Sequence, residues 1–339
     1  MRGSTSNATE EDAVFRLHAF AMPLTVFVTV ADIPTIPTLH MPAPTASGIV
    51  AAADGTVYFV DSFRNTVWKV HAGEAATVFV AGRNGQALQL DADGNLYGMH
   101  EHDDDVVLWR ADAAGTVTAV ARPHVPAHFG HAFVLADNGD IIGSSGTGRR
   151  SGVRLWRAND RERHLLAGGE WGFQDGAGAE ARFFPIGGMA RAPGGGLVVT
   201  SGATIRRVAP DGSVTTVAAG QPLLSPKRSF LSRLFGDVQG HLTGVAVGDS
   251  GEIYVTNSAR GAVMRVDRNG EVVELSNASD GWSPTGVAAA GGSVYVLEYG
   301  PGVRVRRIDA AGRSVILAIV RSDPIAALPL QGRFRPLPA

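Results

Sequence analysis

The strongest constraint on the fold is one short pattern that recurs six times along the chain. In each copy a turn containing Gly leads into a short apolar run. The copies begin at Asp54, Asp93, Asn138, Gly194, Ser250 and Gly291. They lie 39 to 56 residues apart, which is close to the period of a β-propeller blade. The spacing therefore predicts a repeat architecture rather than a set of unrelated domains.

The most regular copy lies in residues 168–220. Its apolar runs occupy residues 188–192, 196–201, 204–208 and 213–218. Each run is too short for an ordinary helix and is bounded by Gly or Pro. Asp211-Gly212, between the last two runs, is a hairpin signal because Gly adopts the positive φ that a tight turn requires. We expect a four-stranded antiparallel meander.

The same four runs can be traced in every copy, and together they account for residues 48–320. The predicted fold class is all-β, a six-bladed β-propeller of four-stranded antiparallel blades. We expect residues 1–13 to be disordered and residues 14–339 to form this single propeller. Residues 25–31 would add a closing strand to the last blade, and residues 321–339 would form an irregular strap.

Composition limits the classes of partner. The formal net charge of −2 gives no basic field for a phosphate backbone, so we expect no nucleic-acid partner. The absence of cysteine excludes disulfides, thiolate metal ligands and cysteine nucleophiles. No Gly-rich loop precedes a helical pattern, so we expect no nucleotide cofactor. The expected partner is a small molecule, and the expected state is a monomer.

No stretch is long and apolar enough to cross a bilayer, and no membrane partner is expected. Residues 19–31 are the most apolar, but Pro23 interrupts them and the acidic residues 10–12 precede them, where a signal peptide carries basic residues. The expected location is therefore cytoplasmic. An internal start at Met22 would instead make residues 22–31 a signal segment for export.

The regular copy resembles the NHL-repeat propellers. The resemblance is carried by Gly172-Phe173, Asp175-Gly176, Ala181-Arg182-Phe183, Ile205-Arg206, Val208 and residues 217–220, and in the first blade by Asp61, Asn65 and residues 67–70. It implies the fold and not an activity. Related six-bladed families include gluconolactonase-like hydrolases, strictosidine synthase-like enzymes and peptidyl-hydroxyglycine lyases. The lyases bind zinc through histidines near inner strands, and the gluconolactonase-like enzymes hold one divalent ion with Glu, Asn and Asp. Neither complete set of metal ligands can be recognised in this sequence.

Propeller geometry gathers two rings of side chains at one mouth of the central channel, because the first strands line the channel and two sets of loops open on the same face. The ring at the ends of the second strands is Asp61, His100, Ser145, Ser201, Asn257 and Glu298. The ring at the starts of the first strands is Ser47, Gln86, His131, Gly187, Thr243 and Thr285. A polar concave mouth is the default ligand site. The predicted binding residues are Asp61, Ser145, Ser201, Thr243, Asn257 and Thr285.

His100 and His131 belong to neighbouring blades and are the main candidates for chemistry. Imidazoles together with a carboxylate such as Glu298 could hold one divalent ion, zinc or calcium, with an open position. His241 is a weaker candidate ligand. Without a metal, His131 or Glu298 would act as a general base.

Each candidate has a structural alternative. Residues 100–105 fit a solvated loop equally well. Asp61 with Asn65, and Asn257 in its own blade, fit turns in which the side chain caps backbone N–H groups. His241 also fits a turn. Glu298 ends an apolar run, and a carboxylate buried there needs a partner, which Arg304 or Arg306 would supply.

The leading functional hypothesis is a small-molecule enzyme of the lyase, hydrolase or cyclase type, with His100, His131, Asn257 and Glu298 at the channel mouth. The alternative is a non-catalytic ligand-binding or protein-binding scaffold, in which the same residues only shape turns. The pairs Arg206-Arg207 and Arg306-Arg307 are expected on third strands, with one residue of each pair on each sheet face. We expect these arginines to form salt bridges between blades.

Overall fold

The structure is a computed structural model, and it describes residues 48–83, 85, 87–102, 105–120, 129–146, 152–159, 162–220, 223, 242–278 and 281–321. All of them belong to one compact unit of the chain, Thr45–Ala339. The side chains of residues 100–102, 105–107 and 129–131 are outside this description, although their backbone is within it. The expected disordered start, the closing strand at residues 25–31, the strap after Arg321 and the candidates Ser47, Gln86 and His241 also lie outside it.

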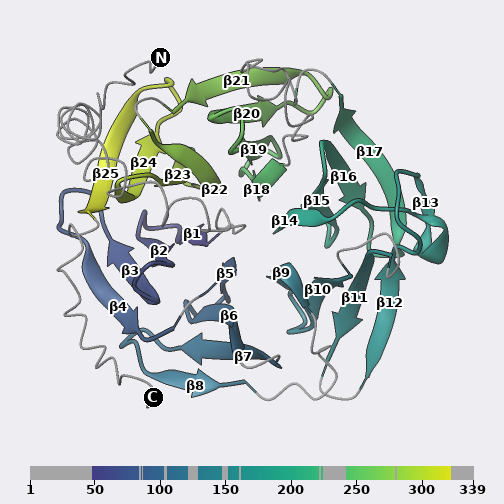
Figure 1. Cartoon of the computed structure of the whole chain (residues 1–339), viewed down its shortest axis with the longest axis horizontal. Helices are drawn as coiled ribbons and strands as arrows, with labels where there is room; N and C mark the ends of the chain where they lie inside the picture. The colour runs from purple at the N-terminus through teal and green to yellow at the C-terminus, as the bar shows by residue number, and fades with distance from the viewer. Residues whose placement is uncertain are drawn as a thin grey trace, which may run out of the picture. The chain divides into compact units, whose positions relative to one another are not determined.

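Six antiparallel sheets surround a common centre (Figure 1). The first blade contains β1 (Ile49–Ala51), β2 (Val57–Asp61), β3 (Thr66–Val70) and β4 (Thr77–Ala81). The second contains β5 (Ala87–Leu90), β6 (Leu96–His102), β7 (Asp105–Ala111) and β8 (Val117–Ala119). The third contains β9 (Phe129–Leu135), β10 (Ile141–Ser145), β11 (Arg154–Ala158) and β12 (Arg163–Ala167).

The second half of the ring repeats this arrangement. The fourth blade contains β14 (Ile186–Arg191), β15 (Leu197–Ser201), β16 (Thr204–Val208) and β17 (Ser213–Ala219), preceded by β13 (Gly176–Ala177) and the short 3₁₀ helix η1 (Gly178–Glu180). The fifth contains β18 (Leu242–Val247), β19 (Ile253–Asn257), β20 (Ala262–Val266) and β21 (Val272–Asn277). The sixth contains β22 (Ser283–Ala290), β23 (Ser293–Tyr299), β24 (Gly302–Ile308) and β25 (Ser314–Arg321). The predicted six-bladed propeller is confirmed.

Each blade is a meander of four consecutive strands, because strands that follow one another in sequence pair with one another. The turns use the predicted chemistry. Gly212 has a φ of 85°, and the carboxylate of Asp211 accepts a hydrogen bond from the Ser213 amide at 2.9 Å. The predicted span 204–208 matches β16 at both ends.

The core lies between blades rather than within them. Six clusters of buried apolar side chains occur, one for each pair of neighbouring blades. One register position on the third strand of each blade carries a large side chain. The residues at that position are Trp68, Trp109, Trp156, Arg206, Met264 and Arg306. The hydrophobic effect therefore holds each blade against the next.

The inner strands β1, β5, β9, β14, β18 and β22 lie nearest the centre of the ring (Figure 1). Four of them, β9, β14, β18 and β22, carry a β-bulge or register irregularity near their start. At the bulge of β14, a Cβ atom on Gly187 would lie 2.0 Å from the Leu242 carbonyl oxygen of β18. Neighbouring inner strands thus approach backbone to backbone, which only Gly permits.

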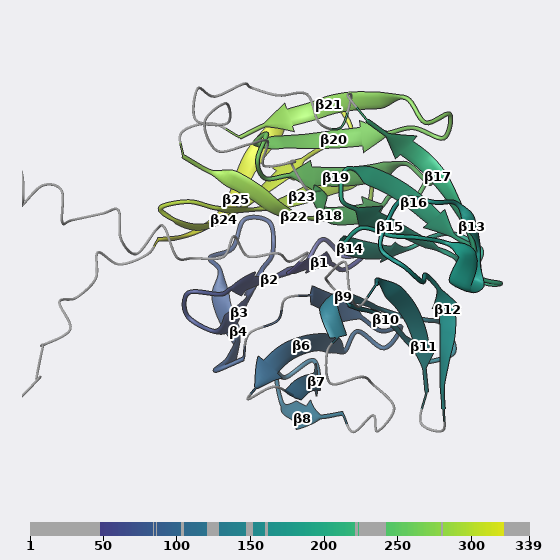
Figure 2. The ribbon, with the colours of Figure 1, turned by 45° about the vertical axis from the view of Figure 1, so that its right-hand side comes forward.

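The fourth blade has a fifth strand that the sequence analysis did not predict. β13 pairs with the outer strand β17 and lies outside it (Figure 2). Arg206, which is fully buried, anchors the segment that carries β13. Its guanidinium donates to Asp175 at 2.5 Å and to the carbonyl oxygens of Gln174 and Arg182.

The arginine pairs on the third strands are placed as predicted, with one side chain of each pair buried. Arg206 and Arg306 are buried, whereas Arg207 is exposed and Arg307 is half-buried. The expectation that they bridge blades by salt bridges is wrong, because the carboxylate partner of each buried arginine belongs to its own blade. Among the described residues, no helix is long and apolar enough to cross a membrane.

Candidate functional site

The ring predicted at the ends of the second strands occupies equivalent register positions. β2, β10, β15 and β19 end at Asp61, Ser145, Ser201 and Asn257. β6 and β23 continue past the equivalent residues, which are His100 and Glu298. The alignment of the six copies therefore places these residues correctly along their strands, and their side-chain contacts decide what they can do.

In the first blade, Asp61 is fully buried and caps a turn. Its carboxylate accepts hydrogen bonds from the amides of Phe63 and Arg64 at 3.0 and 3.3 Å, and it pairs with the Arg64 guanidinium at 2.8 Å. Both oxygens are therefore engaged within the turn. This geometry matches the structural alternative for Asp61.

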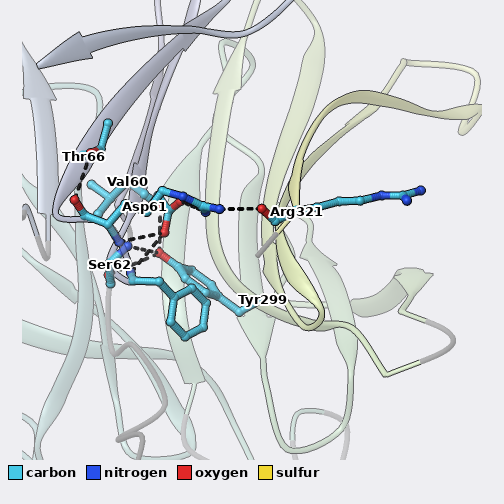
Figure 3. Close-up of polar contacts among 8 residues, drawn as sticks. Val60, Asp61, Ser62, Thr66, Tyr299 and Arg321 are labelled. Atoms are coloured by element: carbon cyan, nitrogen blue, oxygen red, sulfur yellow. Dashed lines mark hydrogen bonds and ion pairs between the residues drawn. The ribbon is translucent and has the colours of Figure 1, made fainter. Parts of the chain in front are cut away.

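Tyr299 lies beside Asp61 and comes from the opposite end of the described chain (Figure 3). Its hydroxyl donates to the Val60 carbonyl oxygen at 2.7 Å and lies 3.4 Å from the Ser62 amide nitrogen, which donates to it. Burial raises the pKa of Tyr299 to about 12, and the nearby charge of Asp61 adds to this increase. The phenol thus stays protonated and joins the first blade to the sixth.

The polar residues of the third, fourth and fifth blades also have internal partners. Ser145 accepts a hydrogen bond from the Trp156 indole at 2.6 Å. Ser201 is buried and donates to the Phe184 carbonyl oxygen at 3.0 Å. Asn257 is buried, donates to the Leu223 carbonyl oxygen at 3.0 Å and accepts from the Arg260 amide at 2.9 Å. The Ser145 contact joins two neighbouring strands, whereas Ser201 and Asn257 hold the segments at Phe184, Leu223 and Arg260 in place.

A network of hydroxyl groups links the inner strands of the fifth and sixth blades. Thr243 lies in the bulge of β18, and its Oγ1 is 2.9 Å from Thr256 Oγ1 and 3.1 Å from Ser258 Oγ. Thr256 donates across to the Thr285 carbonyl oxygen at 3.2 Å. Thr285 is buried and bonds within its own blade, to the Leu297 carbonyl oxygen. Thr243 is half-buried, so it is the more accessible of the two predicted binding threonines.

Glu298 is fully buried and forms two ion pairs. Its Oε1 accepts from Arg306 Nη2 at 2.7 Å, and its Oε2 accepts from Arg306 Nε at 2.9 Å and from Arg304 Nε at 2.5 Å. Three guanidinium N–H groups occupy the two oxygens of this carboxylate, so few lone pairs are left for a metal or a substrate proton. The geometry matches the structural alternative, in which Glu298 is the partner of Arg304 and Arg306.

The two candidate imidazoles lie on strands of neighbouring blades. His100 is in β6 opposite Val107, and the β6–β7 hairpin extends beyond it to a pair between His102 and Asp105. Residues 100–102 and 105 therefore belong to strands rather than to a loop. His131 lies in β9, in the irregular stretch between the pairs made by Phe129 and Phe133. The inner strands β5 and β9 are neighbours, so the backbone brings these two blades together.

A metal centre is not formed by the residues whose side chains the structure describes. Within that part of the chain, no three His, Asp or Glu side chains are grouped as metal ligands. Glu298 is not available as a metal ligand because its carboxylate is paired with Arg304 and Arg306. A metal at the mouth would depend on His100 and His131.

The sequence analysis did not name Tyr299 among the residues of this site, whereas it named Arg304 as a possible partner of Glu298, and the ion pair confirms that prediction. Tyr299 directly follows Glu298 and lies on the opposite face of the same strand, so alternation along β23 was the available signal. Arg304 lies directly opposite Glu298 in the next strand, where the hairpin register brings an acid and a base together.

The fold is shared with several enzymes of low sequence identity. Virginiamycin B lyase from Staphylococcus aureus superimposes with a TM-score of 0.52 at 14% identity, covering 84% of this chain and 87% of that one. A putative gluconolactonase gives 0.54 at 14% identity, with 81% and 90% covered. A gluconolactonase from Xanthomonas campestris gives 0.53 at 14% identity, with 77% and 86% covered.

These similarities establish the six-bladed propeller and its structural neighbours among lyases and gluconolactonases. No protein-family profile matches the sequence, and no curated protein matches it at a significant level.

Proposed function

We propose that this protein is a small-molecule enzyme of the lyase or hydrolase type, with its active site at the channel mouth between the second and third blades. His131 would be the general base or acid, and His100 would be its partner. An imidazole suits this role because its ordinary pKa of about 6.5 lets it both accept and donate a proton near neutral pH. A divalent ion held by the two histidines is part of the proposal.

The observation that carries the proposal is that His100 and His131 lie on strands of neighbouring blades, whose inner strands β5 and β9 are in contact. In the first, fourth, fifth and sixth blades the residue equivalent to His100 is fully buried. The fold neighbours add weight, since they include a lyase and gluconolactonases. Asp61, Asn257 and Glu298 are assigned structural roles in this proposal, and Thr243 remains the best candidate among the predicted binding hydroxyls.

The test is ring opening of cyclic esters, measured by mass spectrometry. Purified protein would be incubated with sugar lactones and with virginiamycin B. Hydrolysis adds the mass of one water to the product, whereas a lyase leaves the mass unchanged, so one measurement separates the two reactions. We expect His131→Ala to reduce turnover by at least about 100-fold, as is typical for loss of a general acid or base.

His164→Ala is the matched control, because His164 is an exposed histidine on the outer strand β12 and pairs with Glu162. Elemental analysis and a chelator series would test the metal. Turnover that survives both His100→Ala and His131→Ala would refute this site. Absence of turnover throughout the panel, together with no stabilisation by zinc or calcium, would favour the binding scaffold.

The scaffold is the second candidate, and the closed contacts in four of the six blades favour it. Its relation to the NHL-repeat propellers rests on the motif in residues 168–220. In that reading the mouth would bind a protein or ligand without chemistry, and substitution of either histidine would change binding only.

A further inference from the structure

The sixth blade contains more buried positive than negative charge. Glu298, Arg304 and Arg306 are exposed by only 0%, 9% and 8%. One carboxylate therefore faces two guanidinium groups, and arginine stays charged at any ordinary pH. The cluster carries an excess of one positive charge in a place where burying an unbalanced charge is costly.

Arg306 is the saturated member of this cluster. It binds Glu298 in a bidentate manner, and its remaining Nη1 donates to Ser276 at 2.8 Å and to Ser314 at 3.1 Å. Ser276 belongs to β21 of the fifth blade, so Arg306 also joins two blades. Nothing in this arrangement calls for a further ligand.

Arg304 has an open side. Only its Nε is used, in the bond to Glu298, and neither of its Nη atoms forms a hydrogen bond with any described residue. Four buried side-chain nitrogens in the described chain lack a partner, and they belong to Trp68, Arg157, Arg206 and Arg307. The Nη atoms of Arg304 are not among these buried nitrogens. Because they also form no hydrogen bond with a described residue, they are in contact with solvent.

Trp282 fixes the orientation of that open side. The Arg304 guanidinium lies over the Trp282 ring, 4.3 Å from its centroid. The indole also packs closely against the chain, because a Cβ atom on Gly300 would be 3.0 Å from the ring. Trp282 precedes β22 in the connection between the fifth and sixth blades, so the guanidinium is stacked at the seam between them. A planar group fixed in this way loses little entropy when it binds a ligand.

We propose that Arg304 and Trp282 form a binding site for a carboxylate group of a small molecule, at the seam between the fifth and sixth blades. The two Nη groups form a planar fork that matches the two oxygens of a carboxylate. A carboxylate brings one negative charge, which balances the excess, whereas a phosphate dianion would reverse it. The site is independent of the imidazoles in the second and third blades.

The fourth blade contains a buried third-strand arginine whose charge is balanced by the chain itself. Arg206 occupies the register position of Arg306, and it is matched by one carboxylate, Asp175, and by two carbonyl oxygens. In the fourth blade, one carboxylate of the chain therefore balances one buried guanidinium. In the sixth blade, the described chain supplies one anion for two.

Calorimetric titration of the full chain with sodium acetate and sodium benzoate tests the proposal, with sodium chloride and inorganic phosphate as comparison anions. We expect saturable one-to-one binding of the carboxylates, with a Kd on the order of 1 mM for such small probes. Arg304→Lys keeps the charge and the ion pair but removes the fork, and it should weaken binding at least about tenfold. Arg313→Gln is the control, since Arg313 forms an exposed ion pair with Asp309.

Several outcomes would overturn the proposal. Absence of saturable carboxylate binding is one, and equal binding by wild type and Arg304→Lys is another. Tighter binding of phosphate than of acetate would refute the carboxylate class. Asp280 precedes Trp282 by two residues and lies outside the described chain. If Asp280→Asn bound acetate and the wild type did not, the chain would already supply the missing anion.

Discussion

At the scale of single residues, the fate of each buried charge depends on a partner from another part of the sequence. Glu298 is neutralised by arginines six and eight residues later, across one hairpin. Arg206 is neutralised by Asp175, which precedes it by 31 residues. The sequence analysis named the partners of Glu298 because they lie close to it along one hairpin. It did not name Asp175 as the partner of Arg206, because the two residues are far apart in the sequence and are brought together only by the fold.

Asp175→Asn should be more damaging than Arg206→Met. The first change leaves a fully buried guanidinium without its carboxylate, and we expect a loss of about 2 kcal/mol in the free energy of unfolding. The second removes the charge itself, and Met264 already fills the equivalent position in the fifth blade. Chemical denaturation of both variants at pH 7 measures the difference. A larger loss in Arg206→Met would contradict this account of the pair.

The pair also predicts how stability depends on pH. Burial acts to raise the pKa of Asp175, but hydrogen bonds from Thr216 and Arg206 outweigh it and hold the pKa below the ordinary value. A depressed pKa stabilises the folded state above the unfolded value of about 3.9 and loses this effect as the pH falls below it. The effect is reduced because the Asp175 side chain is 47% exposed. Wild type should therefore lose stability below about pH 4 faster than Asp175→Asn does.

At the scale of strands, the period and the turn residues were sufficient to predict the blades. Gly at positive φ and short apolar runs are local signals, and they predicted both ends of β16. β13 escaped prediction because it has only two residues, Gly176 and Ala177, and no alternation. Its pairing with β17 depends on the anchor between Asp175 and Arg206, which becomes visible only in three dimensions.

The inner strands set a limit on side-chain size that the sequence alone does not reveal. Gly187→Ala would place a methyl group 2.0 Å from the backbone oxygen of Leu242, so the fourth and fifth blades would have to move apart. We expect a loss of at least about 2 kcal/mol, measured by urea denaturation. Gly248→Ala is the matched control, because its nearest neighbour is the side chain of Tyr254 at 3.1 Å, which can shift. Similar losses in both variants would argue against backbone contact between these strands.

At the scale of the whole ring, the described chain closes without sharing a strand between its first and last blades. β1 to β4 and β22 to β25 each form a complete sheet. The seam between them consists of a buried apolar cluster, the Tyr299 hydroxyl and the bond from Arg64 to the Arg321 carbonyl oxygen (Figure 3). Side chains hold every seam between blades, but this seam joins the first and the last blade, so the two are not consecutive in the chain. It is therefore the place where the ring should open first.

Tyr299→Phe tests this closure. The variant leaves the apolar ring in place and removes the hydrogen bond to Val60, so we expect a loss of about 1 kcal/mol. Native-state hydrogen exchange should show faster exchange of amides in β1, β2 and β23, with β10 and β15 unchanged. Uniform acceleration in all six blades would mean that the ring opens as one unit and that the seam has no special weakness.

The raised pKa of Tyr299 gives the same experiment a second readout. A phenol whose pKa is about 12 in the folded state, against about 10 when unfolded, stabilises the protein below pH 10, and this contribution is lost as the pH rises toward 12. Wild type should therefore lose more stability than Tyr299→Phe between pH 9 and pH 11, when thermal unfolding is compared under identical buffers. Parallel pH profiles would show that the phenol titrates normally, and the buried hydrogen bond to Val60 would then contribute nothing to ring closure.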